Sequence, residues 1–107
     1  MHWVLAHLIG DFILQTDWMV ANKKKSSLVC SIHTLFYIIP FFFSDLYIWQ
    51  ILLIGVQHGI QDRTNFVLWF SILTGSKNFV TKDLAPWSLI LMDQILHILF
   101  ISMVVSL

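Results

Sequence analysis

The chain has 107 residues, of which 58% are hydrophobic and 11% are charged, and its formal net charge is zero. This balance leaves too little polar surface for a soluble domain of this length and favours lipid as the solvent. The neutral charge excludes the electrostatic footprint of a nucleic-acid-binding protein, and the single cysteine, Cys30, excludes an internal disulfide framework and a thiolate-rich zinc site.

Four apolar segments approach or reach the length of about 20 residues that a transmembrane helix needs. In chain order they cover residues 3–21, 28–43, 46–73 and 87–107. We therefore predict an all-α fold, an integral membrane bundle of about four transmembrane helices, with a single domain over residues 1–107.

The segments differ in how they begin and end. The first has no basic residue before its apolar run, and His7 and Asp11 interrupt that run, so we interpret it as a retained helix and not as a signal peptide. In the second, Pro40 lacks a backbone N–H and predicts a kink or a helix end. We expect the third, from Arg63 onward, to leave the membrane or to lie at the interface. Pro86 suits the first turn of the last helix.

Lysines mark two of the polar breaks between the segments. Residues 23–25 follow the first segment, and Lys77 and Lys82 lie between the third and the fourth. In a bundle with four spans these breaks lie on one side of the membrane. The positive-inside rule places them in the cytoplasm, and it places both termini and the polar corner at residues 44–45 outside.

Ionisable side chains inside a span are costly unless they are paired, bind a metal or face water. Three histidine and aspartate pairs are four residues apart, so each pair lies on one helix face. These pairs are His7 with Asp11, His58 with Asp62, and Asp93 with His97. Gln15 extends the first stripe, and the second segment contributes His33.

The polar groups also fall at common depths. A helical rise of about 1.5 Å per residue puts them roughly 9 to 21 Å from the cytoplasmic ends of their helices. From shallow to deep, the layers hold Gln15, His33 and Asp93, then Asp11, Asp62 and His97, then His7 and His58. The sequence thus predicts one polar pocket in the cytoplasmic half of the bilayer.

Imidazoles and carboxylates that converge in a helical bundle are the ligands of zinc, manganese or iron sites. We expect a divalent metal, zinc in the first place, held by His7, Asp11, His33, His58, Asp62, Asp93 and His97. If the site is catalytic, one carboxylate would act as general base, and Asp11, Asp62 and Asp93 all remain candidates. The candidates for orienting a polar or phosphate-bearing substrate are Gln15, Arg63 and Gln94.

The order of these motifs resembles one known family. The string His7-Leu-Ile-Gly-Asp11-Phe-Ile-Leu-Gln15-Thr-Asp17-Trp18-Met, followed by a lysine stretch and His33, is similar to the opening of the bacterial membrane family called domain of unknown function 3307. Its remaining motifs resemble His58-Gly-Ile-Gln-Asp62-Arg63 and Asp93-Gln94-Ile-Leu-His97. The resemblance covers nearly the whole chain. It implies a small multi-pass protein of the bacterial cytoplasmic (inner) membrane, encoded by bacteria or their phages, and supplies no activity.

Three functions fit this pattern. The first is a metal-dependent membrane hydrolase that acts on a lipid or lipid-linked substrate. The second is a non-enzymatic membrane subunit or carrier of a larger complex, in which the cluster binds a metal or relays protons. The third is structural, with the polar groups joining the helices by hydrogen bonds. The expected partners are the lipid bilayer and either further copies of the chain or a larger membrane complex, with no nucleic acid.

Overall fold

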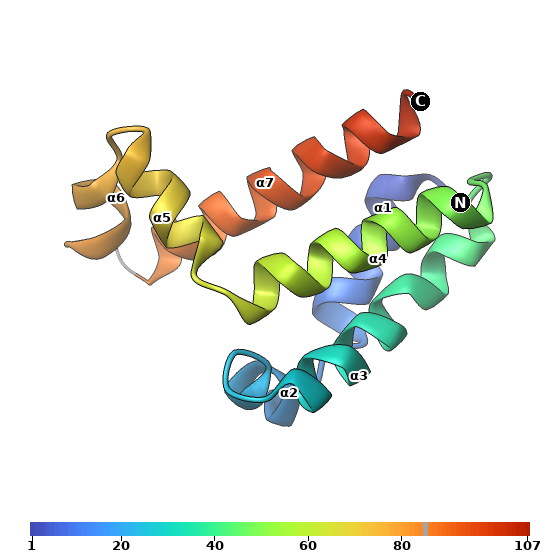
Figure 1. Ribbon diagram of the computed structural model, residues 1–107, viewed down its shortest axis with the longest axis horizontal. Coiled ribbons are helices and arrows are strands. Elements are labelled where there is room, and N and C mark those ends of the chain that lie inside the picture. The colour runs from blue at the N-terminus through green and yellow to red at the C-terminus, as the bar shows by residue number, and fades with distance from the viewer. Residues whose placement is uncertain (85) are drawn as a thin grey trace.

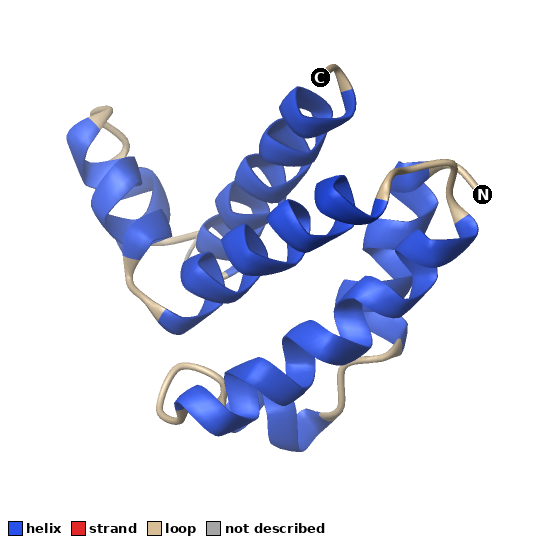
Figure 2. Ribbon diagram, turned by 45° about the vertical axis from the view of Figure 1, so that its right-hand side comes forward, coloured by secondary structure: helices blue, strands red, loops and turns tan. Residues whose placement is uncertain are grey.

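The computed structural model describes residues 1–84 and 86–107 of the chain. These residues form helices joined by turns and loops, with no strand among them (Figure 2). The elements are α1 (Trp3–Leu8), η1 (Ile9–Ile13), α2 (Asp17–Asn22), α3 (Ser27–Ile38), η2 (Ile39–Phe43), α4 (Ile48–Arg63), α5 (Phe66–Leu73), α6 (Lys77–Thr81) and α7 (Trp87–Val105). The all-α fold class expected from the sequence is confirmed.

The first predicted segment is two helices and not one. α1 continues into η1, which is a turn of π-helix, and the helical path ends before Gln15. A new helix, α2, then begins after Thr16, whose extended backbone and side-chain oxygen cap it by accepting a hydrogen bond from the Met19 N–H. The N-cap residue Thr16 and the acidic first-turn residue Asp17 thus start a new helix inside a segment that its apolar composition predicts to be one continuous helix.

Local signals also divide the next two segments. α3 is capped by Ser26 and ends at Ile38, and the chain continues as the 3-10 helix η2, because Pro40 cannot donate a backbone hydrogen bond. α4 ends at Arg63, where Thr64 adopts an extended conformation, and α5 is a separate helix. The polar stretch predicted as a loop over residues 74–86 contains the short helix α6.

The polar cluster is positioned by packing of four long stretches of helix. α3 packs along α4, α4 packs on α7, and α1 with η1 lies against α3, η2 and α7 (Figure 1). Toward the end where both termini lie, these helices enclose an apolar core of Ala6, Tyr37, Phe41, Ile51, Ile54, Ile101 and Val104. At that end the amino group of Met1 donates to the Phe43 carbonyl over 2.8 Å. The histidines and aspartates lie next to this core, on the side of α2 and of the lysines that follow it.

Two glycines allow α3 and α4 to approach each other closely. A Cβ atom on Gly55 would lie 2.9 Å from Ile38 Cγ2, and one on Gly59 would lie 3.0 Å from Thr34 Oγ1. Bare glycine surfaces on α4 therefore accommodate the side chains of α3. This close packing brings His33 of α3 within reach of His58 of α4.

The outer surface of the helices is strongly apolar. Leu35 on α3, Val56 on α4 and Leu99 on α7 are each more than half exposed, as are many other large apolar side chains. Of the helices in the described residues, α7 alone has the length and composition needed to cross a membrane, and shorter apolar stretches cover Trp3–Ile13 and Ser27–Phe43. The four-span bundle therefore stays a prediction.

Candidate metal centre

Four buried ligand groups from three parts of the chain converge on one point. Asp11 comes from η1, His33 from α3, and His58 and Asp62 from α4, and all four side chains are almost completely buried. One ligand atom from each lies within 4.8 Å of the others. We call these four residues the ligand tetrad.

The distances within the ligand tetrad fit a metal ion. His33 Nε2 and His58 Nε2 lie 2.9 Å apart, and they lie 3.0 and 2.9 Å from Asp62 Oδ2. Asp11 Oδ1 lies 3.5 and 3.7 Å from the same two nitrogens. Ligand atoms about 2.0–2.2 Å from a tetrahedral zinc ion are spaced roughly 3.3–3.5 Å apart, so the side chains need to shift only slightly around such an ion.

Protons alone satisfy this arrangement poorly. If both histidines carried a proton on Nε2, two N–H groups would point at Asp62 Oδ2 from nitrogens that are only 2.9 Å apart. If both were protonated on Nδ1, two nitrogen lone pairs would face the carboxylates. If only one carried its proton on Nε2, it could donate to the other ring, but the bare Nε2 of that ring would still face Asp62 Oδ2. A cation between these atoms removes these conflicts, because imidazole nitrogens and carboxylate oxygens then all donate electron pairs to it.

A second set of ligand groups adjoins the first. His97 and Asp93 of α7 join Asp11 in a set whose ligand atoms also lie within 4.8 Å of one another. His97 Nε2 is 3.5 Å from Asp93 Oδ2 and 3.3 Å from Asp62 Oδ1. The His97 ring stacks on His58 with centroids 4.1 Å apart, so the two sets of ligand groups are directly adjacent.

His7 lies beside the cluster and does not belong to either ligand set. Its Nδ1 lies 2.7 Å from the Tyr37 hydroxyl, and its Nε2 lies 2.7 Å from Gln94 Oε1. Gln94 in turn donates from Nε2 to Asp11 Oδ2 over 2.7 Å. Because the glutamine oxygen accepts from His7, the His7 proton lies on Nε2 and Tyr37 donates to Nδ1. This chain of hydrogen bonds fixes the orientation of Asp11.

Lys23 brings a positive charge to the cluster. Its Nζ lies 3.0 Å from Asp62 Oδ2 and donates to Gln15 Oε1 over 2.8 Å. If the imidazoles are neutral, the three carboxylates of Asp11, Asp62 and Asp93 are accompanied by one ammonium group, which contacts Asp62. Among the residues that the structure describes, no other lysine or arginine forms a salt bridge with these acids. A divalent cation would balance the remaining charge.

Several buried polar atoms of the cluster lack hydrogen-bond partners among the described residues. They are Asp11 Oδ1 and the Nδ1 atoms of His33, His58 and His97. Leaving a buried polar atom unpaired costs about 1–3 kcal/mol. An ion in the ligand tetrad would supply the missing partner of Asp11 Oδ1, but not those of the Nδ1 atoms, because the Nε2 atoms of these rings are the ones that face the cluster. Asp11 Oδ1 points at His33 and His58, which is where the ligand tetrad would hold an ion.

A cavity of about 530 Å³ reaches the cluster from the side of the lysines. Asp11, Asp62 and Asp93 contribute to its lining, together with Gln15 and Gln94. Its remaining lining is basic at Lys23, Lys24 and Lys25, polar and uncharged at Thr64 and Asn65, and apolar at Phe12, Val20, Ala21, Val67, Leu68, Leu89 and Ile90. The candidate centre is therefore accessible to a ligand that carries both polar and apolar groups.

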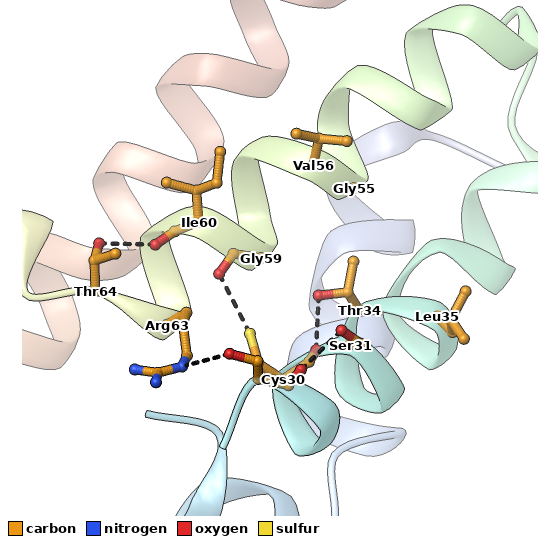
Figure 3. A pocket seen from close by; sticks show the side chains of 11 residues that line it. Cys30, Ser31, Thr34, Leu35, Gly55, Val56, Gly59, Ile60, Arg63 and Thr64 are labelled. Carbon is orange, nitrogen blue, oxygen red and sulfur yellow. Dashed lines mark hydrogen bonds between the residues drawn. The ribbon is translucent and has the colours of Figure 1, made fainter. Parts of the chain in front are cut away.

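Arg63 takes no part in the cluster. Its guanidinium donates to the Lys24 carbonyl over 2.6 Å and to Ser27 Oγ over 3.3 Å. It lines a separate pocket between α3 and α4, where Cys30 Sγ donates to the Gly59 carbonyl over 3.3 Å (Figure 3). The structure thus places Arg63 where it joins the lysine loop to the end of α4, and not where it would orient a substrate at the acids.

A model of one protein family matches residues 1–107, the whole chain, and this family is described as "Protein of unknown function (DUF3307)". The chain belongs to this family. No curated protein and no solved structure matches it. The family expected from the histidine and aspartate motifs is confirmed, and the segments of this chain that carry those motifs meet in the cluster.

Three side chains at the centre were missed in the sequence. Lys23 was assigned only a role in topology, although it contacts Asp62. Tyr37, which stacks on His58 with centroids 3.6 Å apart, is four residues from His33, and this spacing would have revealed it. Gln61 donates to Asp93 Oδ1 over 2.9 Å, and nothing in its position in the sequence, next to Asp62, indicates that contact.

Proposed function

We propose that this DUF3307 chain is a membrane-embedded, metal-dependent hydrolase that acts on a lipid or lipid-linked substrate, with zinc as the preferred ion. The observation that supports this best is the position of the ligand tetrad. Asp11 and Asp62 lie both in the tetrad and in the lining of a cavity that has lysines and apolar side chains in its walls.

The cavity fits an amphiphile. Its apolar walls suit acyl or isoprenoid chains, and its three lysines suit an anionic headgroup. The lysines lie in the turn between α2 and α3, at the end of the bundle opposite the two termini (Figure 1). In the topology expected from the sequence, this end is at the cytoplasmic surface, where the headgroups of the inner leaflet lie.

A bound divalent ion would polarise the scissile ester and make a coordinated water a better nucleophile. The ligand tetrad holds the ion, and the chain from Tyr37 through His7 and Gln94 keeps Asp11 turned toward it. Lys23 holds Asp62 from the cavity side and offers its ammonium group to an anionic substrate. The apolar walls would hold the substrate chains away from water. The acids would then meet the polar headgroup, because they line the same cavity.

The test is to purify the full chain in detergent without a polyhistidine tag and to measure zinc content and hydrolysis together. Two probes distinguish the bond, a short-chain acyl ester and phosphatidic acid, both in mixed micelles. We expect stoichiometric metal and turnover of one probe, with both lost in His58→Gln. Asp45→Asn is the matched control, because Asp45 is exposed and lies far from the cluster in a polar corner.

Two results would contradict the proposal in different ways. A wild-type chain that carries no metal after incubation with zinc would exclude the metal centre. A chain that binds metal but hydrolyses neither probe would exclude the hydrolase and favour the metal-binding subunit or carrier.

A further inference from the structure

The carboxylates of the cluster are divided between two groups of histidines. Asp62 Oδ2 faces His33 and His58, whereas Asp62 Oδ1 faces His97 over 3.3 Å. A carboxylate that presents one oxygen to each of two imidazole groups is a geometry suited to bridging two cations. A single ion in the ligand tetrad would use only Oδ2.

Asp11 contributes a ligand atom to both sets, although its Oδ2 also accepts a hydrogen bond from Gln94 Nε2 over 2.7 Å. Its Oδ1 lies on the side of His33 and His58, and it has no hydrogen-bond partner among the described residues. The residue also belongs to the second ligand set, with Asp93 and His97. Both Asp11 and Asp62 are at least 97% buried, and Asp62 is paired with Lys23, whereas Asp11 forms no salt bridge with a lysine or arginine among the described residues.

His97 and Asp93 are not needed to complete the ligand tetrad, yet they are placed as ligands. His97 is almost fully buried, its Nδ1 has no partner in the described part of the chain, and its Nε2 faces Asp62 and Asp93. Gln61 donates to Asp93 Oδ1, and Asp93 Oδ2 lies 3.5 Å from His97 Nε2 and accepts a long hydrogen bond of 3.4 Å from Gln94 Nε2. These contacts hold two more ligand atoms toward a second position.

We propose that the cluster holds two divalent ions, one in the ligand tetrad and one between Asp62, His97, Asp93 and Asp11, with Asp11 and Asp62 shared by both. This inference rests on the proposed metal centre and specifies its nuclearity and substrate. Two-metal sites of this kind are used in phosphate ester chemistry, where paired ions about 3.5–4 Å apart stabilise the attacking and leaving oxygens.

The charge balance then selects the substrate. Two divalent ions and Lys23 outweigh the three carboxylates of Asp11, Asp62 and Asp93, so the loaded centre is positive. A phosphoester supplies the balancing anion, whereas a neutral carboxylic ester does not. In the hydrolysis, the oxygen of water bonds to phosphorus, the bond from phosphorus to the lipid alcohol oxygen breaks, and one proton of the water passes to that oxygen.

The experiment is a metal count on the tag-free full chain in detergent, after chelation and reloading with Mn²⁺ or Zn²⁺. We expect about two ions per chain in the wild type and about one in Asp93→Asn and in His97→Phe, whose ring keeps the stack on His58. Asp45→Asn should retain the wild-type count. In the Mn²⁺-loaded wild type, electron paramagnetic resonance should show exchange coupling between the two ions.

The outcomes separate the two proposals. One ion per chain in the wild type, unchanged in Asp93→Asn and without exchange coupling, would overturn the two-ion centre and leave the proposed function standing. No bound ion would overturn both. The resonance measurement uses only the wild-type chain, so it decides the question even if the two variants fail to fold.

Discussion

Two histidines that look equivalent in the sequence have different surroundings in the structure. His7 and His58 each lie four residues before an aspartate, but only His58 directs a ring nitrogen at the ligand tetrad. Both ring nitrogens of His7 have hydrogen-bond partners, Tyr37 and Gln94. His7 thus supports Asp11 through Gln94, and its role is to position that carboxylate.

We expect His7→Phe to weaken metal binding by about 10- to 100-fold without abolishing it, because residues that orient metal ligands contribute on that scale. His58→Gln should abolish binding in the ligand tetrad. The measurement is zinc affinity by competition with a chromophoric chelator, and Tyr37→Phe, which removes only a hydroxyl group, should give a smaller loss. Complete loss of metal in His7→Phe would contradict this positioning role and show that His7 is itself a ligand, as the sequence alone suggests.

Lys23 is the cation that the cluster can use when no metal is bound. Its ammonium group is largely buried against Asp62 Oδ2. Removing one partner of a buried ion pair leaves an uncompensated charge, which costs up to about 3–5 kcal/mol.

Lys23→Met should therefore lower the melting temperature of the chelated protein much more than that of the metal-loaded protein. Differential scanning fluorimetry in detergent, with and without zinc, measures both shifts. Lys25→Met is the matched control, because Lys25 is exposed in the same loop. Equal shifts with and without zinc would show that the ammonium group and the ion do not compensate the same charge.

At the scale of elements, η1 sets the direction of Asp11. A π turn closes through hydrogen bonds five residues apart, so it rotates Asp11 relative to His7 compared with an α-helix. It also brings Gly10 against α3, where a Cβ atom would lie 2.5 Å from the Tyr37 carbonyl oxygen. A backbone atom cannot move aside as a side chain can.

Gly10→Ala should therefore push η1 away from α3, destabilise the protein by about 1–3 kcal/mol and reduce metal affinity. Thermal unfolding and the chelator competition measure the two effects. The variant for comparison is Gly59→Ala. Its new methyl group would lie 3.0 Å from the Thr34 side chain, which can move aside, whereas the methyl group in Gly10→Ala would meet a backbone atom. An unchanged metal affinity in Gly10→Ala would mean that the position of η1 does not control Asp11.

At the scale of the whole molecule, the surface and the charged ends fit a protein held in a bilayer. The outer faces of α3, α4 and α7 expose large apolar side chains, far more than a soluble monomer of this size carries. The corner at Asp45 lies with the termini at one end, and the lysines of residues 23–25 lie at the other (Figure 1).

We expect the chain to stay in the membrane fraction after alkaline carbonate extraction. In a Cys30→Ser background, Asp45→Cys should react with a membrane-impermeant maleimide from outside the cell, and Lys77→Cys should react only after permeabilisation. Reaction of both from one side would contradict the multi-pass topology, and release by carbonate would contradict a membrane-embedded bundle.

The sequence by itself determined the helical class, the family and most of the histidines and aspartates of the cluster, because apolar composition and four-residue spacing are local properties of a chain. It indicated the changes near Pro40 and Arg63, but it did not predict the break at Thr16, because a capping residue there interrupts a run that is predicted as one helix from its apolar composition. The tertiary structure alone decided which polar groups meet. The π turn and the close packing of α3 on α4 separate His7 from the ligand tetrad, exclude Arg63 and bring in Lys23. Such contacts depend on helix rotation and distance in space, which spacing along one helix does not specify.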